Sequence, residues 1–273
     1  MKRSWFATPY AIWCVMFTIV PLLFVCYYAF TTKAGAFTLD NLTKITQYTP
    51  VLMDSLRLAL YCTALCLLIG YPAAYFMSSR EMSRNKSLAV LILVPMWMNF
   101  LLRTYAMMTL FENNGVINSL LEMVGLPKQQ MIGTEGAVLV GMVYNFLPFM
   151  ILPIYTILMK LDPSYIEAAG DLGANGVTTF FKVILPLSLP GIISGITMVF
   201  IPSTTTFAIS QLLGGGMTML YGDLIYMKFI TEQSWSAGSA LSIVLLAFVL
   251  LSMGIMRHFD KDSSGEKGGV RKW

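Results

Sequence analysis

The chain has 273 residues, of which 56% are hydrophobic and 12% are charged, and its formal net charge is +4. Soluble domains usually carry about a quarter charged residues, so this chain has too little polar surface to coat a water-soluble globule. Its basic residues gather at the chain ends and in one loop instead of on a basic face, which argues against nucleic acid as a partner.

Six stretches are long and apolar enough to cross a bilayer. A span needs about 20 mostly apolar residues, each rising 1.5 Å, to cross about 30 Å of hydrocarbon. Backbone groups in lipid must pair within their own segment, which favours helices. The expected spans are residues 9–31, 52–77, 87–111, 136–159, 190–212 and 237–257. The sequence therefore predicts an all-α polytopic membrane protein with about six transmembrane helices, forming one permease-like domain over residues 1–273.

The two ends of the chain are expected to differ in structure. The residues Met1-Lys2-Arg3 resemble the charged region of a signal peptide, but the apolar run from Pro9 to about Phe30 exceeds 20 residues. No clear A-x-A cleavage site follows, so we interpret this run as a retained first span. Residues 260–273 are polar and rich in glycine, and we expect them to form a disordered tail.

The distribution of Lys and Arg predicts the orientation. If the N-terminus is cytoplasmic, twelve of the 18 basic residues fall in inside segments and four fall in outside loops. This excess of basic residues inside predicts a multi-pass membrane protein with both termini in the cytoplasm.

The four cysteines all fall inside apolar stretches. Cys62 and Cys66 are four residues apart on one helix face, which allows either a metal pair or two small apolar core residues. No His or acidic residue joins them at ligand spacing, so the core interpretation is favoured and no metal site is predicted.

The loop of residues 160–189, between the fourth and fifth spans, carries the main functional signal. Asp162 is a suitable N-cap, Pro163 suits the first helical position, and Gly173 is placed to end the helix. A second amphipathic stretch runs from about 177 to 185, where Pro186 is expected to stop it. The pattern predicts a short helix-turn-helix at the cytoplasmic membrane surface.

A helix exposed in this way suits an energy-transducing contact. The chain lacks the G-x-x-x-x-G-K-[ST] loop that binds nucleotide phosphates, so ATP-driven transport would need a separate ATPase subunit. The small residues Ala168, Ala169 and Gly170 allow a partner to approach closely, and Glu167 can make a charged or hydrogen-bonded contact at the rim.

The loop resembles the coupling motif of ATP-binding-cassette (ABC) importer permeases, E-A-A-x3-G-x9-I-x-L-P. The matching residues are Glu167, Ala168, Ala169, Gly173, Leu185 and Pro186, and Val183 stands where the family has Ile. The resemblance implies the type I ABC importer permease fold and a loop that docks in a cleft of the ATPase subunit. This chain would bind no cofactor, and the partner subunit would use ATP.

Further motifs are similar to those of spermidine/putrescine importer permeases. They include residues 37–41, 70–72, 94–99, 141–144, 147–150 and 214–215, together with Arg103, Tyr105 and Trp235. This resemblance implies a polyamine substrate, two ATPase copies, a second permease and an extracytoplasmic substrate-binding protein. Other small solutes, such as an iron complex, a sulfate-like anion or an opine, remain the alternative.

Polar residues inside the expected spans are candidates for the translocation pathway. Pro95, Asn99 and Arg103 recur every four residues, which predicts either a pathway stripe or an interhelix hydrogen-bond network with Arg103 reaching outward. Pro202 and the hydroxyls after it predict either a broken helix lining a site or a packing kink. The candidate pathway residues are Trp97, Asn99, Arg103, Tyr105, Tyr144, Thr205, Phe207 and Gln211.

Polyamine binding requires carboxylates and aromatic faces. The acidic candidates near the outer side are Glu112, Asp223 and Glu232, for which the alternative is a solvated loop charge.

An enzyme or a membrane scaffold is the more remote interpretation. The single histidine, His258, lies at the expected cytoplasmic end of the last span, and no hydrolase or zinc-protease motif occurs. A scaffold would not account for the loop motif.

Overall fold

The computed structural model describes residues 8–32, 35–78, 94 and 96–263, and this part of the chain is almost entirely helical. Its only β pairing is an isolated bridge between Thr31 and Phe37. The all-α prediction is therefore confirmed.

Five helical segments are long and apolar enough to span a membrane. They are Ile12–Ala29, Asp40–Ser78, Glu135–Leu158, Gly176–Thr205 and Trp235–Met256. The remaining span, expected at 87–111, lies partly outside the described residues, and its described end forms helix α7 (Phe100–Phe111). About six spans are consistent with this arrangement.

The first span consists of α1 (Thr8–Cys14), a π-helical segment η2 (Val15–Ile19) and α2 (Val20–Ala29). A short α3 (Asp40–Thr43) and a 3-10 turn η3 (Lys44–Tyr48) then lead into the long α4 (Thr49–Ser78). Among the residues of α2, only Ala29 is buried, and α2 packs against α15 (Trp235–Ser263), which in turn packs on α12 (Leu185–Thr205). The first span therefore presents most of its apolar surface outward.

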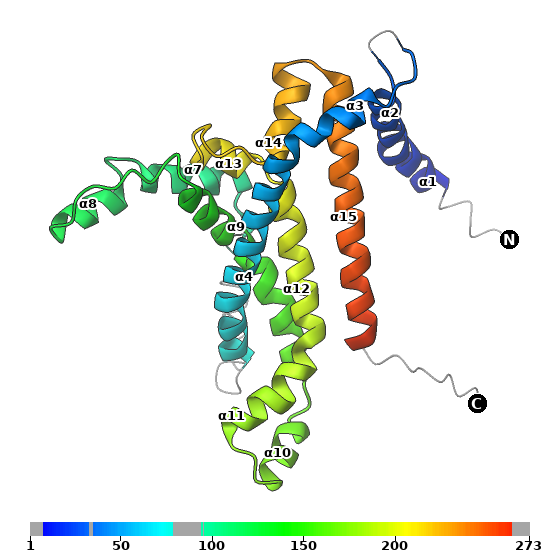
Figure 1. The fold of residues 1–273 in the computed structure, drawn as a ribbon. Coiled ribbons are helices and arrows are strands. Elements are labelled where there is room, and N and C mark those ends of the chain that lie inside the picture. Colours follow the sequence, from blue (N-terminus) through cyan, green and yellow to red (C-terminus); the bar gives the residue numbers. More distant parts are fainter. Residues whose placement is uncertain (1–7, 33–34, 79–93, 95, 264–273) are drawn as a thin grey trace, which may run out of the picture.

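Helices α4, α9 (Glu135–Leu158) and α12 cross one another and form the core (Figure 1). Small residues permit the crossing. A methyl group added at Gly70 of α4 would lie 3.1 Å from the Met150 side chain of α9, and one at Gly195 of α12 would lie 2.7 Å from the Met150 sulfur. At Gly191 the same methyl group would lie 3.0 Å from the carbonyl oxygen of Pro153. Gly191 and Gly195 thus allow the helices to pack closely.

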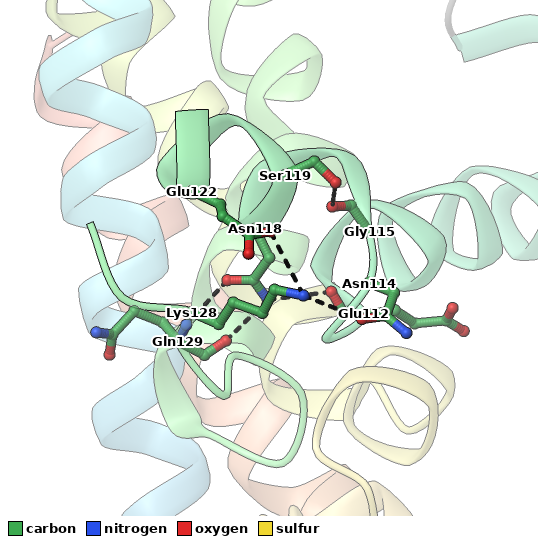
Figure 2. Close-up of polar contacts among 8 residues, drawn as sticks. All are labelled: Glu112, Asn114, Gly115, Asn118, Ser119, Glu122, Lys128 and Gln129. Carbon is green, nitrogen blue, oxygen red and sulfur yellow. Dashed lines mark hydrogen bonds and ion pairs between the residues drawn. The ribbon is translucent and has the colours of Figure 1, made fainter. Parts of the chain in front are cut away.

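An arm made of α7 and α8 (Val116–Met123) extends away from this core (Figure 1). Asn118 holds its turn together. The buried Asn118 amide group donates to the carbonyls of Glu112 (3.1 Å) and Gln129 (3.0 Å), and its oxygen accepts from the Gln129 backbone N–H at 2.9 Å (Figure 2). One side chain thereby satisfies three backbone groups of this loop.

At the opposite end of the molecule from α14 (Tyr221–Tyr226), the chain forms α10 (Ser164–Asp171) and α11 (Gly176–Thr179) (Figure 1). The predicted stop at Pro186 is wrong. A π-helical segment, η4 (Phe180–Ile184), joins α11 to α12 without interruption, so the fifth span begins at Gly176, 14 residues before the expected start at residue 190. Pro186 therefore lies within a continuous helical run, two residues after the π-helical segment ends, and does not stop it.

The fifth span also ends earlier than expected. α12 stops at Thr205, Thr206 is extended (φ −65°, ψ 143°), and a separate short helix, α13 (Ala208–Leu213), follows. The chain therefore breaks at residues 206–207, so this region is broken and not merely kinked; that the break lines a site stays a prediction. Pro202 itself lies within α12 and does not end it.

The stripe expected along residues 95, 99 and 103 is not continuous. Asn99 is non-helical (φ −56°, ψ 132°) and acts as the N-cap of α7, because its side chain accepts from the amides of Leu101 at 2.8 Å and Leu102 at 3.4 Å. Pro95 lies outside the described residues. A four-residue repeat shares a face only within one helix, so this prediction is wrong as a stripe.

Candidate functional site

The loop helix α10 lies at one end of the molecule (Figure 1). It contains the first three residues of the coupling motif, Glu167, Ala168 and Ala169. The helix begins one residue later than predicted, at Ser164, and the Asp162 side chain accepts from the Ser164 amide at 2.9 Å. This hydrogen bond lowers the pKa of Asp162 below its usual value. The carboxylate thus stabilises the first turn although the capping position itself is Pro163.

Gly173 ends α10 as predicted. It has a positive φ of +79°, and the amide of Ala174 bonds back to the carbonyl of Ala169 at 3.0 Å. This is the closing geometry that glycine permits after a helix.

The motif residues differ in burial. Ala169 is buried, whereas Glu167, Ala168 and Pro186 are exposed and Leu185 is half-buried. Beside them Leu172 is 88% exposed, which is a large apolar exposure for a loop on the surface. A methyl group added at Gly170 would meet nothing within 4 Å, so the fold of this chain does not itself require glycine there.

The loop is tied to α4 by an aromatic cluster and a hydrogen bond. The Phe180 ring of η4 meets Tyr71 and Tyr75 of α4 edge-on, with ring centroids 5.8 Å and 5.3 Å apart. The Tyr71 hydroxyl lies 2.9 Å from the Ser188 hydroxyl of α12, which donates to the Leu185 carbonyl at 2.9 Å. Because the single Ser188 proton serves Leu185, Tyr71 is the donor in the bond between the two hydroxyls.

At the other end of α12, the break at residues 206–207 meets the start of α14. A methyl group added at Gly222 would lie 2.7 Å from the carbonyl oxygens of Thr205 and Thr206. Only glycine allows the backbone of α14 to approach the open end of α12 this closely. The Thr205 hydroxyl turns back toward the carbonyls of its own last turn, at 3.3–3.4 Å.

Asp223 lies next to this contact and is 7% exposed. Its Oδ2 accepts from the Leu220 amide at 2.8 Å, and its Oδ1 is buried without a hydrogen-bond partner among the described residues. Burial raises the pKa of Asp223 to about 6, against the opposing effects of the Ser210 hydroxyl and the Leu220 amide. In the described part of the chain Asp223 is the only buried carboxylate.

The other two acidic candidates are placed differently. Glu232 is occupied, because the Lys228 ammonium donates to both of its carboxylate oxygens at 2.8 Å and also lies 5.2 Å from the Tyr48 ring centre. Although burial acts against it, the hydrogen bonds to Glu232 and Tyr48 raise the pKa of Lys228. The Glu112 side chain is exposed on the arm, pointing away from Asn118 in Figure 2.

The predicted pathway residues are divided among several elements. Phe207 and Gln211 lie at the break and on α13, Tyr144 on α9, and Tyr105 on α7. All of them are exposed, as are Trp97 and Asn99 before α7, and Thr205 is half-buried. Arg103 differs, because it is 6% exposed and its Nε has no hydrogen-bond partner among the described residues. Its expected outward reach is therefore wrong.

The sequence analysis did not predict two features of the structure. Tyr226 stacks on Phe207, with ring centroids 5.4 Å apart and planes 11° from parallel. Tyr226 lies three residues after Asp223, a spacing that places both on one face of a helix and that could have linked them in the sequence. The bond between Tyr71 and Ser188 joins residues 117 apart in sequence and leaves no local pattern.

Cys62 and Cys66 lie in the core, both fully buried. The Ser203 hydroxyl contacts the Cys62 sulfur at 3.5 Å. The described residues contain no group of three or more metal-ligating side chains.

Comparison with known proteins identifies relatives over nearly the whole chain. A family described as the binding-protein-dependent transport system inner membrane component matches residues 4–264. Curated relatives include the spermidine/putrescine transport system permease proteins PotB of Haemophilus influenzae, 39% identical over 91% of both chains, and of Escherichia coli K12, 37% identical over 89% of this chain and 91% of that one.

Solved structures share the fold. A bacterial ABC transporter involved in importing the acidic polysaccharide alginate aligns with a TM-score of 0.74 over 94% of this chain and 96% of that one, at 18% identity. A chain of the MetNI methionine ABC transporter aligns with a TM-score of 0.61 over 81% of this chain and 98% of that one, at 16% identity. The expected importer-permease fold is thereby confirmed.

Proposed function

Because this chain belongs to the family of binding-protein-dependent transport system inner membrane components, we propose that it is the permease subunit of an ATP-driven polyamine importer. It is a transport permease and a multi-pass protein of the inner membrane. The observation that carries the polyamine assignment is its 37–39% identity, over about nine-tenths of each chain, to two permeases named for spermidine and putrescine.

The proposed assembly contains this chain, a second permease, two ATPase copies and an extracytoplasmic substrate-binding protein. ATP is hydrolysed by the ATPase subunits, and this chain performs no catalysis. The cytoplasmic side is the end that carries α10, and both termini lie on that side. A reporter fused after the last residue, active only in the cytoplasm, measures this orientation.

The coupling loop docks on the ATPase through α10. The exposed Glu167 and Ala168 contact it directly, and the buried Ala169 packs the helix against the rest of the loop. Gly173 closes the helix, and Leu185 and Pro186 lie at the start of α12. The exposed Leu172 and the unfilled space at Gly170 support this role, since both are unexplained by packing within the chain. We assign the pathway to the residues predicted from the sequence, among them Thr205, Phe207 and Gln211.

The test is uptake of labelled spermidine and putrescine in cells that carry the partner subunits, with and without this chain. We expect uptake to require this chain and to be lost in Glu167→Gln, whereas the matched variant Glu122→Gln, on the exposed arm, retains it. An assembled complex that takes up neither amine would refute the polyamine assignment.

An importer of an anion is the second candidate, favoured by the buried Arg103. Uptake of labelled sulfate in the same cells decides between the two.

A further inference from the structure

The break between α12 and α13 places a buried acid beside backbone carbonyls at an interrupted helix. Gly222 brings α14 against the carbonyls of Thr205 and Thr206, and Asp223 follows it directly. Interrupted helices near the centre of transporters often present carbonyl groups to cations. A carboxylate at the same place increases the negative potential there.

One carboxylate oxygen of Asp223 lacks a hydrogen-bond donor within the described ranges. Its helix-capping role uses Oδ2 and the Leu220 amide, while Oδ1 is buried and has no hydrogen-bond partner among the described residues. The neighbouring Ser210 hydroxyl donates instead to the Phe207 carbonyl, at 2.8 Å. No ion pair joins Asp223 to any residue of the described part of the chain. A buried, unpaired carboxylate is costly, so such groups are usually matched by a cation or a donor when the protein works.

Two aromatic rings lie on the same elements. Phe207 belongs to the break itself and Tyr226 lies one helical turn after Asp223, and the two rings are stacked. Phe207 is 42% exposed and Tyr226 is 40% exposed, so part of each ring is accessible from outside the chain. An aromatic face and a carboxylate together form a favourable environment for an ammonium group.

We propose that the Asp223 carboxylate, with the rings of Phe207 and Tyr226, binds one primary ammonium group of an aliphatic amine substrate at the break between α12 and α13. This inference rests on the proposed function and assigns a residue for substrate charge to this chain. In this structure Oδ1 is closed to solvent, so the ammonium reaches it only when α13 or α14 moves at the break. The ammonium then donates to Oδ1, and its alkyl chain lies along the exposed parts of the rings. Glu232 does not compete for it, because Lys228 already neutralises that carboxylate.

The variant Asp223→Asn separates charge from capping, because an amide oxygen can still accept from the Leu220 N–H. The full complex is reconstituted in vesicles and uptake of labelled spermidine is measured as kcat/KM. We expect a loss of about 10- to 100-fold, the range for a hydrogen bond to a charged group. Co-purification of the ATPase subunit with the Asp223→Asn chain checks that the complex has assembled. The matched control Glu122→Gln transports like the wild-type chain.

A second pair of variants does not depend on the stability of α14's cap. Tyr226→Phe retains the ring and should keep uptake within about twofold, whereas Tyr226→Leu should raise KM severalfold, as expected for loss of a cation–π contact worth about 0.5–1 kcal/mol. If Tyr226→Leu and Tyr226→Phe behave alike, the rings do not bind the substrate.

The outcomes distinguish the two proposals. If the wild-type complex transports spermidine and Asp223→Asn transports it equally well, the ammonium site is refuted and the polyamine permease stands. If the wild-type complex transports no amine, the proposed function fails and the ammonium site fails with it.

Discussion

The bond between Tyr71 and Ser188 allows a quantitative test of how the loop is attached to the core. Both residues are nearly or fully buried, at 8% and 0% exposure. Tyr71→Phe removes one neutral hydrogen bond and leaves Ser188 with its Leu185 partner, so we expect a cost of about 0.5–1.5 kcal/mol. Ser188→Ala removes both bonds and leaves the Tyr71 hydroxyl buried without an acceptor, which costs about 1–3 kcal/mol.

The double variant Tyr71→Phe/Ser188→Ala should be more stable than Ser188→Ala alone. In it no buried hydroxyl of the pair remains unsatisfied, and replacing both partners with apolar groups is the cheaper change. The thermal unfolding midpoint of the purified chain in detergent measures all three variants.

Tyr75→Phe is the matched control, because the Tyr75 ring meets Phe180 but its hydroxyl makes no hydrogen bond to the described residues. Its midpoint should match that of the wild-type chain. Additive losses in the double variant, or a Ser188→Ala midpoint above that of Tyr71→Phe, would refute the assigned donor and acceptor.

Three further predictions follow from the geometry. Gly191→Ala should destabilise the chain by about 1–3 kcal/mol, because the added methyl group meets α9 backbone that cannot yield, whereas Gly254→Ala, with open space around it, should not lower the thermal unfolding midpoint. Gly170→Val should leave that midpoint nearly unchanged, yet abolish co-purification of the ATPase subunit if α10 docks there. Since the pKa of Asp223 is raised to about 6 from 3.8, the stability it contributes is complete below pH 3.8 and is lost as pH rises through 6. The midpoint should therefore rise from pH 7 to pH 5 by more in the wild-type chain than in Asp223→Asn, and equal rises would contradict the buried charge.

Local signals in the sequence predicted much of this structure. The long apolar runs predicted four of the five described spans, and most of the predicted ends lie within a few residues of the observed ends. Bilayer thickness fixes the length of a spanning helix, which makes such a prediction possible. Gly173 was predictable as a helix end because a left-handed residue there favours glycine. The close packing at Gly191 was predictable for a similar reason, since only a small residue lets two helices approach.

Other features depended on information that a local pattern lacks. Pro186 suggested a stop because proline usually ends a helix, but the helical run continues through it after the π-helical segment. The repeat from Pro95 to Arg103 assumed one continuous helix, which the N-cap at Asn99 interrupts. Asp223 is buried because α13 and α14 fold back on the break. In the sequence alone, Asp223 could not be distinguished from a solvated carboxylate in a loop.

Helix α4 connects the two regions discussed here. Near one end, the Ser55 hydroxyl accepts from the Tyr221 amide at 2.7 Å, two residues before Asp223. Near the other end, Tyr71 bonds to Ser188 beside the coupling loop. The 16 residues between them span about 24 Å at 1.5 Å per residue, most of the thickness of the hydrocarbon core. Since packed helices move as units and do not stretch, α4 links α12 beside the coupling loop to α14 beside the break. A displacement of the coupling loop should therefore reach the break without any change within the helices themselves.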